Sequence, residues 1–141
     1  MISRKSKQRE AILNIVKNTN CHPNAEWVYE HLRRVMPHIS LGTVYRNLRL
    51  LKDEGLLKEL RFNGSQSRFD GNTSDHAHFI CDKCEQIADV DESMGAEIKY
   101  DTIISNGLEV THHTVTYFGL CSDCLKSTHK NTVSSTRVVT N

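Results

Sequence analysis

The first half of the chain contains three segments in which apolar residues recur at helical spacing, and each is predicted to form a helix. The first covers residues 8–17 and the second residues 25–35. The third begins after Ser40, a favourable N-cap residue, and ends at Gly55, the expected C-cap. Its apolar stripe consists of Leu41, Val44, Leu48 and Leu51. Residues 1–7 are polar and basic, and we expect them to be frayed.

A short β-hairpin is predicted after the third helix. Residues 56–62 are expected to form one strand, Asn63 and Gly64 a tight turn, and residues 66–70 the return strand. Three helices followed by a basic hairpin are typical of a winged helix-turn-helix, whose third helix enters the major groove of DNA. The polar, aromatic and basic side chains expected to contact DNA are Thr43, Tyr45, Arg46, Arg49 and Arg61. The alternative interpretation is a charged, solvated helix that binds nothing.

The second half of the chain has a different pattern, with strands predicted on both sides of a pair of cysteines. Strands are expected over residues 78–80, 86–90 and 109–118, and a helix over residues 94–104. From Lys126 the chain is rich in Ser and Thr and has no core-forming pattern. The pattern predicts an α+β protein with a winged-helix domain over 1–70, a hinge over 71–75, a metal-binding domain over 76–127 and a disordered tail over 128–141.

The two halves carry opposite charge, although the net charge of the whole chain is only +1. Residues 1–70 contain 13 Lys and Arg against 7 Asp and Glu, whereas residues 71–141 contain 5 against 10. A basic first half is expected to bind a polyanion, and an acidic second half to bind cations. Chance segregation of surface charge is the alternative.

No apolar run approaches the roughly 18 residues that a membrane-spanning helix needs, and no apolar core of a secretory signal follows the basic N-terminus. We therefore expect a soluble, cytoplasmic protein with no membrane partner. Paired cysteines in a reducing compartment are typical of metal sites rather than of disulfides.

Four of the five cysteines fall into two Cys-x-x-Cys pairs, separated by 36 residues. Each pair places two sulfurs on one tight turn, and two such turns together form a tetrahedral S₄ site for Zn²⁺. The ligands would be Cys81, Cys84, Cys121 and Cys124. Four thiolates leave no open coordination position, so the predicted zinc is structural. Redox-active dithiols or disulfides are the alternative.

The stretch between residues 69 and 89 holds a second set of potential ligands. It contains two carboxylates at its ends, Asp70 and Asp89, and a His-x-His pair, His76 and His78. Imidazole mixed with carboxylate suits Fe²⁺, Mn²⁺ or Zn²⁺ in a more open site than four thiolates form. Such a site could belong to a hydrolase or peroxidase, although no general base or substrate pocket is evident, and no catalytic residue is predicted.

Five motifs resemble the ferric uptake regulator (Fur) family, in the same order and at similar spacing. They are Cys21-His22-Pro23, the run from Gly42 to Leu48, the run from Ser67 to Asp70, the run from Asp75 to His78, and the two cysteine pairs. The similarity covers about residues 8–126. Members of that family are homodimeric, metal-dependent repressors with an N-terminal winged helix and a C-terminal α/β dimerisation domain, so the resemblance implies the same fold and function here.

The resemblance also implies a regulatory metal, Fe²⁺ or Mn²⁺, distinct from the zinc. Its implied ligands are His22, Asp70, His76, His78 and Asp89. Because these residues come from both domains, the metal would fix the spacing of two winged helices in a dimer, and a palindromic operator in double-stranded DNA would match that spacing. A DNA-binding module in which both metals are structural is an alternative.

One residue indicates the branch of the family. Sensors of iron level generally have Glu where this chain has Asp89, whereas peroxide sensors of the PerR type have Asp. The resemblance therefore implies a repressor that hydrogen peroxide inactivates by oxidising a ligating histidine, His22 or His76. The alternative is a Fur-type sensor of Fe, Mn or Zn level that controls metal uptake genes. The family usually has a further helix before Gln8, and here only Met1–Lys7 precede it, so weaker DNA binding is expected.

Overall fold

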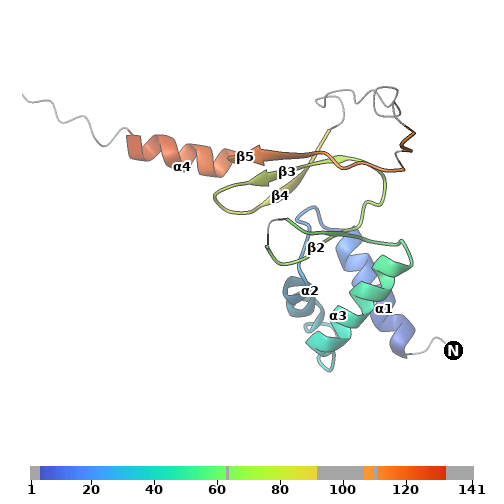
Figure 1. Ribbon diagram of the computed structural model, residues 1–141. Helices are drawn as coiled ribbons and strands as arrows, with labels where there is room; N and C mark the ends of the chain where they lie inside the picture. Colours follow the sequence, from blue (N-terminus) through green and yellow to red (C-terminus); the bar gives the residue numbers. More distant parts are fainter. Residues whose placement is uncertain (1–3, 63, 92–106, 110, 133–141) are drawn as a thin grey trace, which may run out of the picture. The chain divides into compact units, whose positions relative to one another are not determined.

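The computed structural model describes residues 4–62, 64–91, 107–109 and 111–132, and the chain divides into two units, Met1–Ser74 and Asp75–Asn141 (Figure 1). Each unit has its own sheet, of two strands in the first and three in the second. Within the described ranges, no helix is both long and apolar enough to span a membrane.

The first unit is built from three helices and a hairpin. Helices α1 (Arg4–Lys17), α2 (Ala25–Leu32) and α3 (Leu41–Asp53) are followed by strands β1 (Lys58–Leu60) and β2 (Arg68–Asp70), which pair antiparallel. The helices enclose an apolar core that includes Ile12, Val16, Val28, Leu48, Leu51, Leu57 and Phe69. The predicted winged helix-turn-helix is confirmed.

Helices α2 and α3 are both capped at their N-terminal ends, and the cap of α3 is the predicted residue, Ser40. The side chains of Asn24 and Ser40 accept hydrogen bonds from the backbone N–H groups of Trp27 (2.8 Å) and Thr43 (3.1 Å). Gly55, which follows α3, has φ +72°, a left-handed conformation that favours glycine. These caps fix where α3 begins and ends.

Two helix boundaries differ from the predictions. Helix α1 begins at Arg4, so residues 4–7 are helical rather than frayed. Helix α2 ends at Leu32 rather than at residue 35, because the chain turns before Pro37, whose ring disfavours a helical residue in front of it. Val35 therefore lies beyond the end of the helix, and it is 75% exposed.

The second unit is a three-stranded sheet followed by a helix. Strand β3 (Ala77–Cys81) lies between β4 (Ile87–Val90), to which it is antiparallel, and β5 (Thr116–Gly119), to which it is parallel (Figure 1). In the β3–β4 pairing His78 is opposite Asp89. Helix α4 (Ser122–Thr132) follows β5.

Two predictions for the second unit are corrected by the structure. The third strand covers only Thr116–Gly119, and residues 111–115 are not part of a strand. The expected disordered tail begins too early, because α4 continues through residues 128–132. Hydroxyls of Ser127 and Thr128 donate hydrogen bonds to the Cys124 carbonyl, so these polar side chains are accommodated within the helix. The helix expected over 94–104 lies outside the described residues.

Gly71, near the end of the first unit, lies directly against α1. A Cβ atom at this position would be 2.7 Å from the Cα of Lys17, closer than side chains approach backbone atoms. The absence of a side chain at residue 71 therefore allows the chain leaving β2 to pass over the C-terminal end of α1.

Candidate metal sites and nucleic-acid interface

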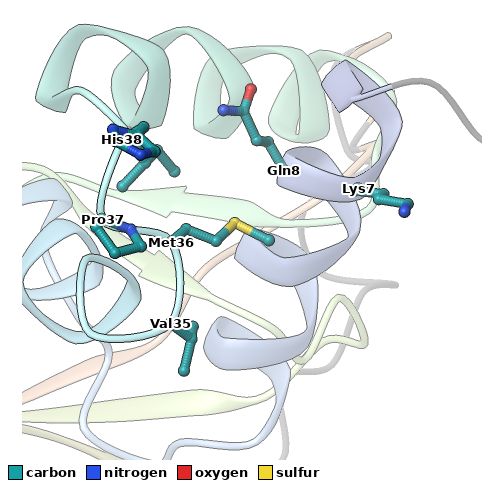
Figure 2. Close-up of a pocket in the computed structure, with 7 residues that line it drawn as sticks. Lys7, Gln8, Val35, Met36, Pro37 and His38 are labelled. Carbon is teal, nitrogen blue, oxygen red and sulfur yellow. The ribbon is translucent and has the colours of Figure 1, made fainter.

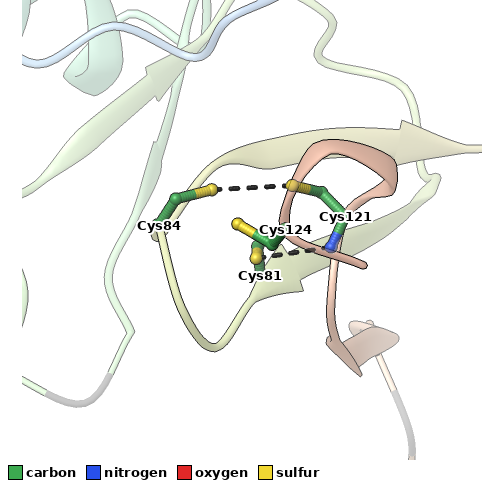
Figure 3. Close-up of side chains that lie close together, drawn as sticks. All are labelled: Cys81, Cys84, Cys121 and Cys124. Atoms are coloured by element: carbon green, nitrogen blue, oxygen red, sulfur yellow. Dashed lines mark hydrogen bonds between the residues drawn. The ribbon is translucent and has the colours of Figure 1, made fainter. Parts of the chain in front are cut away.

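The four paired cysteines converge in the second unit, as Figure 3 shows. Cys81 ends β3, Cys84 lies in the turn before β4, and Cys121 and Cys124 lie at the start of α4. One sulfur from each lies within 4.8 Å of all the others, and the Sγ atoms of Cys84 and Cys121 are 3.7 Å apart. Four sulfurs about 2.3 Å from one Zn²⁺ would be separated by roughly 3.8 Å, so the cluster fits a tetrahedral zinc.

The thiol chemistry of this cluster also favours a cation. The backbone N–H of Cys121 donates to Cys81 Sγ (3.3 Å), and this hydrogen bond is the main cause that lowers the pKa of Cys81 to about 6. The hydrogen bond with the Cys121 side chain raises the pKa of Cys124 to about 12. The fold thus favours one thiolate but opposes further negative charge, which a bound divalent cation would neutralise. All five cysteines are free in this structure.

A second donor set in this unit consists of His76, His78 and Asp89. The Nε2 atoms of His76 and His78 lie 3.1 and 3.5 Å from Oδ1 of Asp89. Histidines two residues apart project to the same side of an extended chain, and Asp89 reaches them from the neighbouring strand. Their rings are 4.4 Å apart, so two nitrogens and a carboxylate oxygen converge on one point.

The first unit contains a buried His–Asp pair. Nε2 of His22 lies 3.7 Å from Oδ2 of Asp70, and the two side chains are only 3% and 5% exposed. His22 has φ +48°, an unusual conformation for a residue other than glycine. Hydrogen bonds from Phe69 N–H to the Pro23 carbonyl (2.9 Å) and from Arg68 to the His22 carbonyl (3.4 Å) hold this turn against β2. Strain is therefore maintained at a residue whose side chain is a potential ligand.

The five residues that the resemblance assigned to a regulatory metal thus occur as two preorganised sets, one in each unit. Together they offer three imidazole nitrogens and two carboxylates, a donor set that suits Fe²⁺, Mn²⁺ or Zn²⁺ and does not discriminate among them. His22 and Asp70 are 48 residues apart in sequence. Their contact could not be predicted from spacing alone.

The first unit also has a basic cavity of about 650 Å³ between α3 and the hairpin. It is lined by Tyr45, Arg46, Arg49 and Lys52 of α3 and by Glu59, Arg61, Ser67 and Phe69 of the hairpin region. Four of the five residues predicted to contact DNA are among them. The fifth, Thr43, is half-buried at the start of α3, and its hydroxyl lies 2.9 Å from that of Ser40.

Two acidic residues next to these DNA-contact candidates were missed by the sequence analysis. The Tyr45 hydroxyl donates a hydrogen bond to Glu26 of α2 (2.7 Å), and this bond raises the pKa of Tyr45. Glu59 lies inside the cavity and pairs with Arg61 and Lys52. The alternation of β1 would have placed Glu59 and Arg61 on the same face, but only the fold places Lys52 beside them.

A smaller cavity, of about 280 Å³, lies between the beginning of α1 and the connection between α2 and α3 (Figure 2). It is lined by Lys7, Gln8, Val35, Met36, Pro37, His38 and Ile39. This lining is mainly apolar and contains no acidic side chain, so it forms neither a metal site nor a continuation of the basic cavity.

The chain matches the profile of one protein family and is similar to characterised members of it. The profile of the ferric uptake regulator family matches residues 2–118. The peroxide-responsive repressor PerR of Staphylococcus aureus is 40% identical over 117 residues, which are 83% of this chain and 79% of that protein. PerR of Staphylococcus epidermidis is 39% identical over 117 residues, 83% of this chain and 78% of that protein.

Solved structures agree with the sequence comparison. The Campylobacter jejuni peroxide stress regulator is 28% identical and superposes with a TM-score of 0.68, covering 86% of this chain and 91% of that chain. The Helicobacter pylori ferric uptake regulator Fur, described as having three functional metal binding sites, gives a TM-score of 0.72 at 23% identity, over 85% of this chain and 81% of that chain. At 23% identity, the similarity to the Helicobacter pylori protein shows a shared fold only.

Proposed function

This chain belongs to the ferric uptake regulator family, and we propose that within it the protein is a homodimeric, metal-dependent repressor that hydrogen peroxide inactivates. Its relatives at about 40% identity are named peroxide-responsive repressors. The observation that carries the proposal is the convergence of His76 and His78 on Asp89, the residue that the resemblance associates with peroxide sensing. The protein would act in the cytoplasm as a regulator and not as an enzyme.

Two metals have separate roles in this proposal. The four thiolates Cys81, Cys84, Cys121 and Cys124 would hold the structural Zn²⁺, since their sulfurs already lie at distances that suit it. The histidines and aspartates would hold the regulatory Fe²⁺ or Mn²⁺. When bound, this second metal supplies a positive centre that neutralises the two carboxylates and, as Fe²⁺, a one-electron reductant for peroxide.

The five regulatory ligands are proposed to act as one site. His22 and Asp70 come from the first unit and His76, His78 and Asp89 from the second, so a metal bound by all five would restrict how the two units move. In a homodimer this restriction would set the distance between two α3 helices, and a palindromic operator with matching half-sites would bind best. Loss of one ligand would release the restriction and, with it, the DNA.

The basic cavity supports DNA as the partner. Arg46 and Arg49 on α3, together with Arg61 on the hairpin, place cationic side chains on two elements that flank one groove. Arginine binds phosphate oxygens and the O6 and N7 atoms of guanine with the same planar fork, so these residues suit both contacts to the DNA backbone and contacts to base edges.

Peroxide sensing would occur at a ligating histidine, His22 or His76. In net terms one oxygen atom of H₂O₂ replaces a ring hydrogen of the imidazole to give a ring C–OH group, and the other oxygen leaves as water. The imidazole carbon is oxidised and the peroxide reduced. The modified ring is a poorer ligand, so the repressor would lose its metal-dependent affinity for DNA.

A decisive test compares protein loaded anaerobically with Fe²⁺ or Mn²⁺, each before and after a low dose of hydrogen peroxide. We expect DNA binding to require the metal. Peroxide should add one oxygen atom to a peptide containing His22 or His76, and release DNA, only in the iron form. Asp89→Glu should retain metal-dependent DNA binding but lose the oxidation.

Other outcomes would identify the alternatives. Metal-dependent DNA binding without histidine oxidation would identify a sensor of Fe, Mn or Zn level. DNA binding that persists when a chelator removes only the weaker metal would mean that both metals are structural. Turnover of a substrate by the metal-loaded protein would support an enzyme instead.

A further inference from the structure

The basic cavity between α3 and the hairpin contains one acidic side chain, that of Glu59. This side chain is only 16% exposed. Its Oε1 accepts hydrogen bonds from Nε and Nη2 of Arg61 at 2.9 and 2.8 Å, and its Oε2 lies 3.6 Å from Nζ of Lys52. The two carboxylate oxygens thus face cations from two different elements, the hairpin and α3.

The carboxylate of Glu59 is ionised at neutral pH. A hydrogen bond with the Ser67 side chain, followed by Arg61 and Lys52, holds the pKa of Glu59 below its usual value. A negative charge therefore stands among the side chains that would meet DNA phosphates. Nζ of Lys52 also lies 3.5 Å from Oδ1 of Asp53, whereas Arg61 donates two hydrogen bonds to Glu59.

A carboxylate in this position should weaken sequence-independent DNA binding more than it weakens sequence-specific binding. Contacts to phosphates fix a protein on DNA but carry no sequence information directly, and each one steepens the salt dependence of binding by about 0.9 in log–log slope. A phosphate that approaches Arg61 must displace Glu59 or share the guanidinium with it. Base contacts from α3 do not face this competition to the same degree.

We propose that Glu59 is a specificity-determining residue of the DNA-binding face: its carboxylate competes with DNA phosphates for Arg61 and Lys52, and so weakens binding to DNA of any sequence. The inference rests on the proposed function, in which this face binds DNA. It predicts that Glu59 improves the ratio of operator to random-sequence affinity, although it removes attraction for the polyanion.

The test uses Glu59→Gln, which keeps the size of the side chain and removes its charge. Glu54→Gln is the matched control, because Glu54 belongs to the same unit, pairs with Arg9 at 3.0 Å and lies outside the cavity. Full-length protein loaded with Zn²⁺ and Mn²⁺ is titrated onto a random-sequence duplex and onto a duplex selected with the wild-type protein, at several salt concentrations. Thermal melting checks that each variant is folded.

For the random-sequence duplex at about 0.1 M salt, we expect Glu59→Gln to bind on the order of fivefold to tenfold more tightly than wild type, with a salt slope steeper by about 0.9 for each protomer that contacts the DNA. The selected duplex should gain less, so the affinity ratio falls. Glu54→Gln should leave this ratio unchanged.

Three results would overturn the inference. If Glu59→Gln behaves as Glu54→Gln does, the carboxylate has no special role in DNA binding. If Glu59→Gln binds both duplexes more weakly than wild type does, Glu59 holds Arg61 and Lys52 in position for DNA rather than competing with phosphates for them. If the selection with wild-type protein enriches no duplex and the random-sequence duplex is not bound either, the proposed function fails and the inference fails with it. This result is distinct from the first two, in which wild type binds DNA normally.

Discussion

Asp89 lies directly opposite His78 in the antiparallel pairing of β3 and β4, and its Oδ1 atom is 3.1 Å from Nε2 of His76 and 3.5 Å from Nε2 of His78. One carboxylate oxygen thus faces two imidazoles through a register that backbone hydrogen bonds fix. The register of a strand pair is difficult to change, because a shift by one residue moves every side chain to the opposite face. The donor set of the second unit is therefore formed by the sheet itself.

Asp89→Asn should weaken Mn²⁺ binding at least tenfold, because the neutral amide removes the charge that balances the cation while the two histidines stay in place. Calorimetric titration with Mn²⁺ measures the affinity directly. Glu109→Gln, which removes one exposed negative charge from the same unit, is the control and should not change it. Wild-type Mn²⁺ affinity in Asp89→Asn would exclude Asp89 as a ligand.

Cys124→Ser should abolish zinc binding and unfold the second unit, since structural zinc sites contribute on the order of 10 kcal/mol of folding free energy. Cys21→Ser should keep one zinc per chain, because Cys21 belongs to the first unit and its thiol accepts a hydrogen bond from Thr19. Elemental analysis and circular dichroism provide the two readouts. When Mn²⁺ occupies the regulatory site, a zinc content of one per chain in Cys124→Ser would contradict the four-thiolate site.

Gly71→Ala should destabilise the first unit by about 1–3 kcal/mol, because the new Cβ would overlap the Lys17 backbone. Gly42→Ala is the contrasting variant. A Cβ at residue 42 meets nothing within 4 Å, and alanine favours helix α3, so the first unit should become more stable by about 0.5–1 kcal/mol. The single tryptophan, Trp27, lies in α2, and its fluorescence during urea unfolding reports on this unit. Equal stability of the two variants would contradict the close approach.

Glu59 should make the stability of the first unit depend on pH. Its pKa is lower in the folded protein than in the unfolded chain, so its stabilising contribution is complete above the unfolded pKa, near 4.5, and disappears as the pH falls through the folded value. Glu59→Gln should therefore be less stable than wild type at pH 7, and the difference should vanish in acid. Urea unfolding followed by Trp27 fluorescence measures this difference. A difference that stays constant with pH would mean that the charge of Glu59 has no part in it.

The elements of the first unit were predictable because local rules agree with the packing. Val44, Leu48 and Leu51 of the apolar stripe of α3 are buried, Ser40 caps the helix, and Gly55 follows its end. The boundary errors have local physical causes. Residues 4–7 have no apolar periodicity and become helical by continuing α1, and the turn before Pro37 shortens α2.

Contacts between residues that are distant in sequence were harder to predict. Spacing identified the two cysteine pairs and the His-x-His pair as potential ligands, but it gave no contact between His22 and Asp70 and no place for Glu59. The polar composition after Lys126 hid α4, which begins at the second cysteine pair. There Lys83 donates a hydrogen bond to Ser127 (3.1 Å) and links the turn of the first pair to the helix. Such contacts depend on residues that only the complete fold brings together.

The central position of β3 has a consequence for synthesis of the chain on the ribosome. Its antiparallel neighbour β4 follows within six residues, so His76, His78 and Asp89 can be brought together while the polypeptide is still growing. Its parallel neighbour β5 and the second cysteine pair are translated much later. At roughly 5–20 residues per second, Cys81 and Cys84 leave the peptidyl-transferase centre about two to seven seconds before Cys121 and Cys124. Until the second pair has been added, Cys81 and Cys84 supply only half of the ligand set, so the four-thiolate zinc site cannot be completed before β5 and the start of α4 have been made.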